Sequence, residues 1–115
     1  MSEQTDIFDY QSLAAMMQND QNIIQIIIES FISDMTLQIN ALEGQISSAD
    51  IESAQKQCHK IKGASANIRA NEMFALTTEM DKAGKAGDMQ GISSRLDELK
   101  QAYQAFVDAA QSHMS

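Results

Sequence analysis

One short stretch of the chain combines residue types that suit phosphoryl chemistry. His59 is followed by Lys62 three residues later and by Gly63 four residues later. A neutral imidazole nitrogen is nucleophilic near pH 7, so His59 can accept a phosphoryl group. Lys62, with Lys60 as a second candidate, would supply positive charge, and a charge-assisted contact is about twice as strong as a neutral hydrogen bond. The stretch therefore indicates a histidine that carries a phosphoryl group.

The helical spacing around His59 predicts where its side chain lies. At about 100° per residue, the expected core positions of this helix centre roughly 120° away from His59. The core positions are Ile51, Ala54, Cys58, Ile61, Ser65 and Ile68, and the residues sharing the face of His59 are Gln55, Lys56, Lys62, Gly63 and Ala66. His59 is therefore expected to be largely exposed, at the edge of the packed stripe.

The presence of Gly63 inside a helix calls for an explanation, because glycine there lowers stability by about 1 kcal/mol relative to alanine. One turn after His59, it would clear space for another molecule to approach the imidazole ring. Close packing between helices is the alternative, since the small residues Ala64–Ala66 follow directly. Both interpretations stay open.

The charge distribution points to a local anionic site or an acidic partner surface. The net charge is −8, which argues against general nucleic-acid binding. No Asp or Glu occurs between Glu52 and Glu72, and most basic residues fall in one region: Lys56, Lys60, Lys62, Arg69, Lys82 and Lys85. The simpler alternative is a solvated lysine face.

Other chemistries fit the sequence less well. Zinc needs three or four ligands, and Cys58 and His59 point about 100° apart on a helix. We expect Cys58 to be a small buried hydrophobe, and a single cysteine excludes an internal disulfide. No nucleotide-binding glycine loop is present, so no autokinase activity is expected. Any phosphoryl group must come from another molecule.

Length and hydropathy predict one domain spanning residues 1–115. There is no secretory signal, and the apolar run Ile23–Ile28 is too short to span a bilayer. A soluble cytoplasmic protein, with no membrane contact, is expected.

Apolar residues recur at helical spacing and there is no proline, which predicts an all-helical chain. A short helix capped by Asp9 would carry Leu13, Met16 and Met17. A long helix capped by Asn19 or Asp20 would bury the seam Ile24, Ile28, Phe31, Met35, Ile39, Leu42 and Ile46, with Ile23, Ile26 and Ile27 widening it. The turn 47–50 would lead into a helix over 51–68.

Two further helices complete the predicted fold. Asn71 is expected to cap a helix with Met73, Leu76, Met80 and Ala83 inward, ending between Gly84 and Gly87. Asp88 is expected to start the last helix, with the seam Ile92, Leu96, Leu99, Tyr103, Phe106 and Ala110. The fold class is all-α: an antiparallel up-down-up-down four-helix bundle over about residues 20–112, with a short additional N-terminal helix across one end.

The segment His59-Lys60-Ile61-Lys62-Gly63 resembles the motif of histidine-containing phosphotransfer (HPt) domains. The resemblance covers nearly the whole chain, including the short first helix with Asp9, the Phe31 position and the four-helix layout. It implies that His59 accepts a phosphoryl group, usually on Nε2, from an aspartyl phosphate of a receiver domain and passes it to another receiver. Lys62 would stabilise its charge and Gly63 would give access.

The same resemblance assigns roles to residues outside the motif. Asp81 stands 22 positions after His59, where the family often places an acidic or amide residue that hydrogen-bonds the other ring nitrogen. A solvated surface acid is the alternative for Asp81. Lys85 would lie on the docking face. Met16, and less clearly Met17, would give an adaptable apolar contact for the receiver, although Met17 fits a core position equally well.

Arg69 departs from the family pattern, because a glycine is usual ten residues after the histidine. Arginine tolerates a positive φ poorly, so the junction after this helix is expected to run on helically or to turn differently.

The implied partners are response-regulator receiver domains and a hybrid sensor histidine kinase. No cofactor is expected on this chain, since the receiver supplies the Mg²⁺ site, and no metal site is expected here. A monomer is expected, and the N-terminal Met favours a free-standing protein over a domain of a hybrid kinase. The alternatives are a helical adaptor that binds a receiver or kinase through the same face without phosphorylation, and a purely structural bundle.

Overall fold

The computed structural model describes residues 6–114, and within them all regular structure is helical. The helices are α2 (Tyr10–Met16), α3 (Gln21–Ser47), α4 (Ile51–Ile68), α5 (Asn71–Lys85), α6 (Met89–Ser93) and α7 (Leu96–Met114). The prediction of an all-α fold is confirmed.

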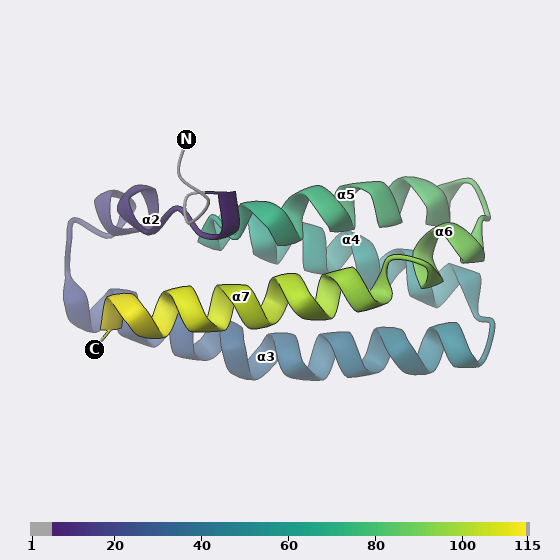
Figure 1. Ribbon diagram of the computed structural model, residues 1–115, viewed down its shortest axis with the longest axis horizontal. Helices are drawn as coiled ribbons and strands as arrows, with labels where there is room; N and C mark the ends of the chain where they lie inside the picture. The colour runs from purple at the N-terminus through teal and green to yellow at the C-terminus, as the bar shows by residue number, and fades with distance from the viewer. Residues whose placement is uncertain (1–5, 115) are drawn as a thin grey trace.

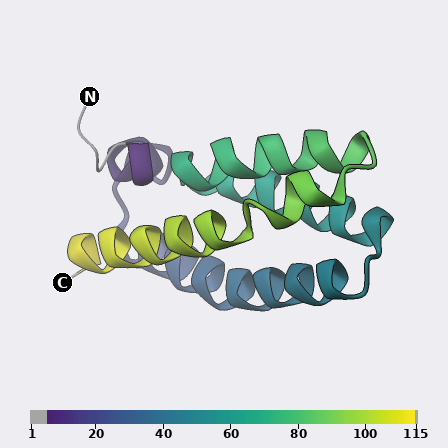
Figure 2. The same ribbon diagram turned by 45° about the vertical axis from the view of Figure 1, so that its right-hand side comes forward.

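The helices α3, α4, α5 and α7 run side by side with alternating direction (Figure 1). The short helix α2 lies at the end of the bundle where α4 ends and α5 begins, and Figure 2 shows the same arrangement from a second side. This is the predicted up-down-up-down bundle, with the additional short helix at one end.

Aspartates begin most of these helices. The side chains of Asp9, Asp20, Asp50 and Asp88 each accept a hydrogen bond from a backbone N–H in the first turn of the helix that follows. Such caps satisfy donors that have no partner within the helix. The predicted cap at Asn71 is wrong by one residue, because Ala70 occupies the cap position of α5 and Asn71 is its first helical residue.

The last predicted helix is interrupted. Asp88 caps the short helix α6, and the chain turns at Ser94 and Arg95 before α7 begins at Leu96. The Nη1 atom of Arg95 donates to the carbonyl of Gly91 at 2.7 Å. Ile92 and Leu96 are both buried across the break, so the apolar spacing continues through it and does not reveal it.

The core follows the predicted seams with two exceptions on α3. Ile24, Ile28 and Met35 are fully buried, but Ile23 and Ile26 are exposed, so the predicted widening of the seam is wrong for these two residues. Ile27 is half-buried against the core. The side of α3 that carries Ile23 and Ile26 therefore faces solvent.

The first described segment packs on the C-terminal end of α7. The rings of Phe8 and Phe106 lie 4.6 Å apart, and Phe31 contacts Phe106 from α3 at 4.9 Å. The Tyr10 ring stacks on His113 at 4.1 Å, with the two planes 3° apart. These aromatic contacts place α2 on the bundle.

Arg69 adopts the left-handed conformation that a glycine would take. Its φ is 68°, it ends α4, and its carbonyl accepts from the backbone N–H of Asp9 at 3.0 Å. Its guanidinium contacts the Ala66 carbonyl at 3.5 Å and the Met16 sulfur at 3.0 Å. The expected change of geometry at this junction is therefore wrong, because these contacts help hold an arginine in a conformation it disfavours.

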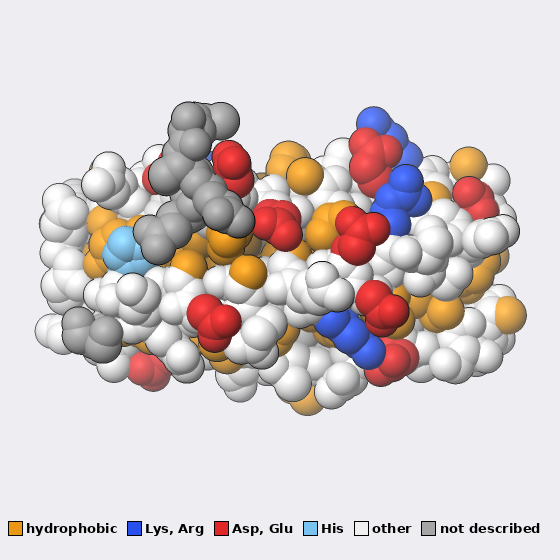
Figure 3. Space-filling view, viewed as in Figure 1, with side chains coloured by type: hydrophobic (Ala, Val, Ile, Leu, Met, Phe, Trp, Pro, Cys, Tyr) orange, Lys and Arg blue, Asp and Glu red, His pale blue; other side chains and the backbone are white. Residues whose placement is uncertain are grey.

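The surface charge is mixed. Figure 3 shows acidic side chains spread along the face formed by α5 and α7, with Lys and Arg side chains on the half nearer α6. Within residues 6–114, no helix has the length and apolar character needed to cross a membrane.

Candidate functional site

His59 lies in the middle of α4 with 61% of its side chain exposed. Its neighbours Cys58 and Ile61 are fully buried, so the core stripe of α4 fixes the direction in which His59 points. The expected position at the edge of the packed stripe is what the structure shows.

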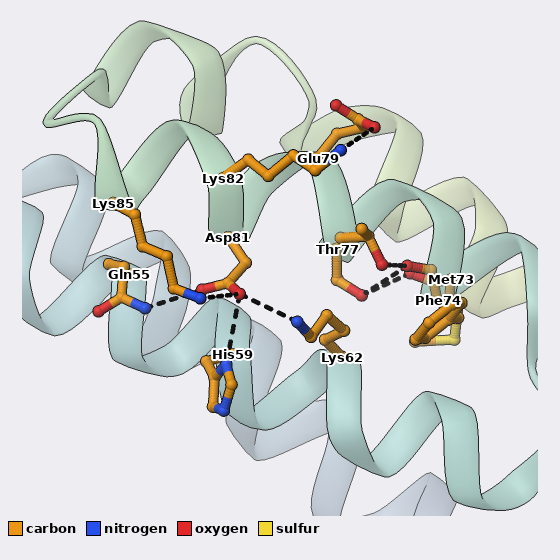
Figure 4. A network of polar contacts seen from close by, with 11 residues as sticks. Gln55, His59, Lys62, Met73, Phe74, Thr77, Glu79, Asp81, Lys82 and Lys85 are labelled. Atoms are coloured by element: carbon orange, nitrogen blue, oxygen red, sulfur yellow. Dashed lines mark hydrogen bonds and ion pairs between the residues drawn. The ribbon is translucent and has the colours of Figure 1, made fainter.

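Asp81 on α5 is the centre of the polar cluster around His59 (Figure 4). Its Oδ2 lies 3.3 Å from His59 Nδ1, 3.1 Å from Lys62 Nζ and 3.2 Å from Lys85 Nζ. The Asp81 side chain is only 2% exposed, so the alternative of a solvated surface acid is wrong.

The pKa of Asp81 reflects two opposing effects. Burial alone would raise the pKa of this carboxyl, because it disfavours the charged form. Hydrogen bonds from Gln55, Lys62, His59 and Lys85 outweigh burial and hold the pKa of Asp81 well below its usual value. The group is therefore a carboxylate at neutral pH, which can accept a hydrogen bond from the Nδ1–H group of His59.

The ring nitrogens of His59 consequently differ. A neutral imidazole carries one proton, and a carboxylate beside Nδ1 favours the tautomer in which Nδ1 holds it. Nε2 then has a free lone pair on the exposed side of the ring. In this tautomer Nε2, and not Nδ1, is the ring nitrogen with a lone pair available for a new bond.

The two lysines near Asp81 differ in burial. Lys62 is 26% exposed and Lys85 is 59% exposed, and both reach the same carboxylate oxygen. Their positive charges lie beside the imidazole, in reach of an anionic group that approaches the ring. The sequence predicted Lys62 next to His59 but placed Lys85 only on the docking face.

Gly63 is exposed, and a Cβ built on it would meet no atom within 4 Å outside its own helical backbone. Close helix packing therefore does not explain this glycine, and the interpretation that it keeps space open near His59 remains. Gly84 is the glycine that packs closely: its Cβ would lie 2.6 Å from the Cβ of Gln55. The prediction that this helix ends between Gly84 and Gly87 is confirmed, because α5 ends at Lys85.

Gln55 is half-buried and its side chain points toward α5 (Figure 4). Its Nε2 donates to Asp81 Oδ1 at 2.7 Å. Sequence reasoning placed Gln55 on the face of His59 but missed this contact. Gly84 was the available signal, because a glycine inside a helical pattern often marks a close approach of another chain segment.

The remaining predicted residues lie around the cluster without joining it. Lys56 is exposed and pairs with Glu52 at 3.1 Å. Lys60 is exposed and, within residues 6–114, forms no ion pair, whereas Ala66 is half-buried. Met16 is 51% exposed and contacts Arg69.

An apolar groove opens along α2, α3 and α4, and on α4 it begins at Ala64, two residues after Lys62. Its volume is about 370 Å³, and its lining residues are Leu13, Met16, Met17, Ile27, Phe31, Ala64, Asn67 and Ile68. Met17 thus lines the groove while packing partly against the core. The groove and His59 lie along the same helix, α4.

Two further groups bear on the chemistry. Cys58 is buried and free, and burial together with the charge of Asp81 raises its pKa to about 12, so it is not a nucleophile at neutral pH. No group of three or more His, Cys, Asp or Glu residues suited to a metal ion occurs in the described part of the chain.

Comparison with known proteins gives one informative match. No curated protein and no solved structure matches the chain. The family model of the Hpt domain matches residues 26–109, which include His59, Lys62, Gly63 and Asp81. That family performs histidine phosphotransfer in phosphorelays. The match covers most of the sequence and the helical bundle agrees with it, so the chain belongs to the Hpt domain family and takes part in histidine phosphotransfer.

Proposed function

We propose that His59 accepts a phosphoryl group from the aspartyl phosphate of one receiver domain and passes it to the aspartate of another. The observation that carries this proposal is the contact between His59 Nδ1 and the Asp81 carboxylate, which favours the tautomer with a free lone pair on Nε2 in a side chain that is largely exposed. The chain acts as a carrier and not as a kinase.

The step is a displacement at phosphorus. The Nε2 lone pair attacks the phosphorus, the P–O bond to the receiver aspartate breaks, and its electron pair leaves with the carboxylate. The imidazole becomes positively charged while Nδ1 keeps its proton, and the adjacent Asp81 carboxylate stabilises that charge. Transfer to the second receiver reverses these bond changes, with the N–P electron pair returning to Nε2.

Lys62 and Lys85 would balance the charge of the phosphoryl oxygens. Both ammonium groups lie beside the ring, and neither needs to lose a proton in the step. Their contribution is electrostatic, because the two ammonium charges attract the negatively charged oxygens of the phosphoryl group. The Mg²⁺ that neutralises the aspartyl phosphate would belong to the receiver.

The apolar groove would seat the receiver. Met16 at its rim is exposed and unbranched, so it can adapt to more than one partner surface. Gly63 lies between His59 and the groove on α4, and because it has no side chain, no group projects from the helix at that point. A receiver bound in the groove would then bring its aspartate to Nε2.

The test is phosphoryl transfer from a panel of labelled receiver domains to the wild type, to His59→Gln and to His113→Gln. His113 is the other histidine of the chain and supplies the matched control. We expect acid-labile, alkali-stable label on the wild type and on His113→Gln, and none on His59→Gln. Absence of label from every receiver, with binding equal in all three proteins, would favour an adaptor instead.

The docking part of the proposal has its own test. Met16→Ser should slow transfer from a receiver, whereas phosphorylation by the small donor phosphoramidate should stay at the wild-type rate. Equal slowing of both reactions would mean that Met16 acts on the histidine and not on docking.

A further inference from the structure

Asp81 is held through its two oxygens by different kinds of donor. Oδ2 faces His59 and the ammonium groups of Lys62 and Lys85, whereas Oδ1 accepts from the neutral Nε2 amide of Gln55 at 2.7 Å. This is the shortest of the four contacts to the carboxylate. Figure 4 shows Gln55 on the far side of the carboxylate from Lys62.

The lysines are poor anchors for Asp81 during the reaction. Each is a cation on a long flexible side chain, and a phosphoryl group on Nε2 would offer it a more strongly charged acceptor. A lysine that turns toward the phosphoryl group releases Oδ2. Gln55 carries no charge and lies toward α5. The phosphoryl group therefore attracts its amide less strongly than it attracts the lysines, and the hydrogen bond to Oδ1 is kept.

The position of Gln55 depends on the close approach of α4 and α5. A Cβ on Gly84 would lie 2.6 Å from Gln55 Cβ, 2.8 Å from its Cγ and 3.0 Å from its Cα. The last of these is a backbone atom, so the helices would have to separate to admit a side chain at Gly84. The glycine therefore lets the amide reach Asp81, three residues earlier on α5.

We propose that Gln55, seated against Gly84, is a positioning residue that holds the Asp81 carboxylate against His59 Nδ1 throughout phosphoryl transfer. This inference rests on the proposed function of His59. Without the amide, Oδ1 loses its hydrogen-bond donor, and the carboxylate can rotate so that Oδ2 moves away from Nδ1. Neutral His59 would then shift toward the tautomer with the proton on Nε2, which has no free lone pair at the reacting atom.

Two variants separate the hydrogen bond from packing. Gln55→Met keeps an unbranched side chain against Gly84 without a donor or a charge, and Gln55→Glu keeps the shape but replaces the donor by an acceptor. The matched control is Gln57→Met on the same helix, since Gln57 contacts Gln45 and Gln38 instead of Asp81. Melting temperatures of all four proteins show whether each variant folds.

Two readouts are measured on each protein. Nitrogen-15 chemical shifts of His59 give the fraction of the neutral ring protonated at Nδ1, and this needs no phosphoryl donor. The rate of phosphorylation by phosphoramidate then gives the reactivity of Nε2 without any docking step.

We expect both Gln55 variants to lose Nδ1–H tautomer and to react about tenfold more slowly, the effect of losing one hydrogen bond to a charged group. Gln57→Met should match the wild type in both readouts. Unchanged tautomer and rate in folded Gln55→Met and Gln55→Glu would overturn the inference while leaving the proposed function intact. A wild type that takes no phosphoryl group would overturn the proposed function, and the tautomer measurement would still decide whether Gln55 orients His59.

Discussion

The Nδ1 atom of His59 lies 3.3 Å from the Oδ2 atom of Asp81, which joins an exposed ring on α4 to a buried carboxylate on α5. Asp81 is expected to influence two properties that can be measured separately, the reactivity of His59 and the stability of the fold. The carboxylate lies beside Nδ1 of the ring, and its charge balances the two lysines that meet Oδ2.

Replacing Asp81 by asparagine should therefore affect both activity and stability. Asp81→Asn removes the charge that stabilises the cationic ring, so phosphorylation of His59 should slow by at least about tenfold. It also leaves the half-buried Lys62 without its counter-ion, at a cost of about 1–3 kcal/mol in unfolding free energy. Phosphoramidate kinetics and urea unfolding test the two effects.

Glu79→Gln is the matched control for that experiment. Glu79 lies on the same helix and pairs with Lys82 at 3.5 Å, with both side chains largely exposed. Exposed pairs of this kind contribute about 0–1 kcal/mol. A loss of stability as large in Glu79→Gln as in Asp81→Asn would show that the buried position of Asp81 is not what matters.

The lowered pKa of Asp81 predicts a specific acid sensitivity. Because the folded protein binds this proton less readily than the unfolded chain does, Asp81 stabilises the fold fully at pH values above its unfolded pKa of about 4. That contribution is lost progressively as pH falls below about 4 toward the lower folded pKa. Urea unfolding at pH 7 and pH 3 should show a smaller acid-induced loss in Asp81→Asn than in the wild type, and equal losses would contradict the assignment.

Gly63→Ala should raise stability and lower transfer from receivers. The added Cβ meets no atom within 4 Å and improves helix propensity, so unfolding free energy should rise by about 0.5–1 kcal/mol. The methyl group occupies space next to the route to His59, so receiver-dependent transfer should slow. Thermal unfolding and transfer kinetics are the two measurements.

Gly44→Ala provides the comparison, because Gly44 lies inside α3 and its added Cβ would also meet nothing within 4 Å. It should give the same gain in stability with unchanged transfer. Slower transfer in Gly44→Ala would show that the effect of Gly63→Ala is not local to His59.

Substitution by glycine should change the unfolding free energy differently at two residues with positive φ. Ala49 has φ 56° in the exposed turn before α4, and Ala49→Gly should raise the unfolding free energy by about 1 kcal/mol. Arg69→Gly relieves similar strain but loses the contacts to Ala66 and Met16, so its gain should be smaller. Thermal unfolding compares them, and a larger gain in Arg69→Gly would mean that the guanidinium contacts contribute nothing.

Helix boundaries were predictable where a cap and the apolar spacing agree. Asp50 begins α4, and the predicted range 51–68 is the range observed. The interruption after Ser93 was not predictable from spacing, because Ile92 and Leu96 stay buried on both sides of it. The exposure of Ile26 was missed because spacing alone does not show which sides of α3 have neighbours.

The site residues that were predictable from the sequence are those that lie on one helix or that the family resemblance points to. His59, Lys62 and Gly63 share α4, and the family resemblance pointed to Asp81. The contact of Gln55 with Asp81 depends on the distance between α4 and α5, which follows from the packing at Gly84 and not from either helix alone. Arg69 shows the converse, since contacts from α2 allow a backbone conformation that its own residue type disfavours.

The stack of Tyr10 on His113 joins the first described helix to the last turn of α7. Met16, at the rim of the groove, belongs to that first helix, whereas His59 and Asp81 need only α4 and α5 to come together. The contact with α7 therefore supports a helix that lines the groove, although α7 itself contributes no lining residue. A partner bound in the groove would therefore depend on a contact between α2 and α7 that the pair of His59 and Asp81 does not need.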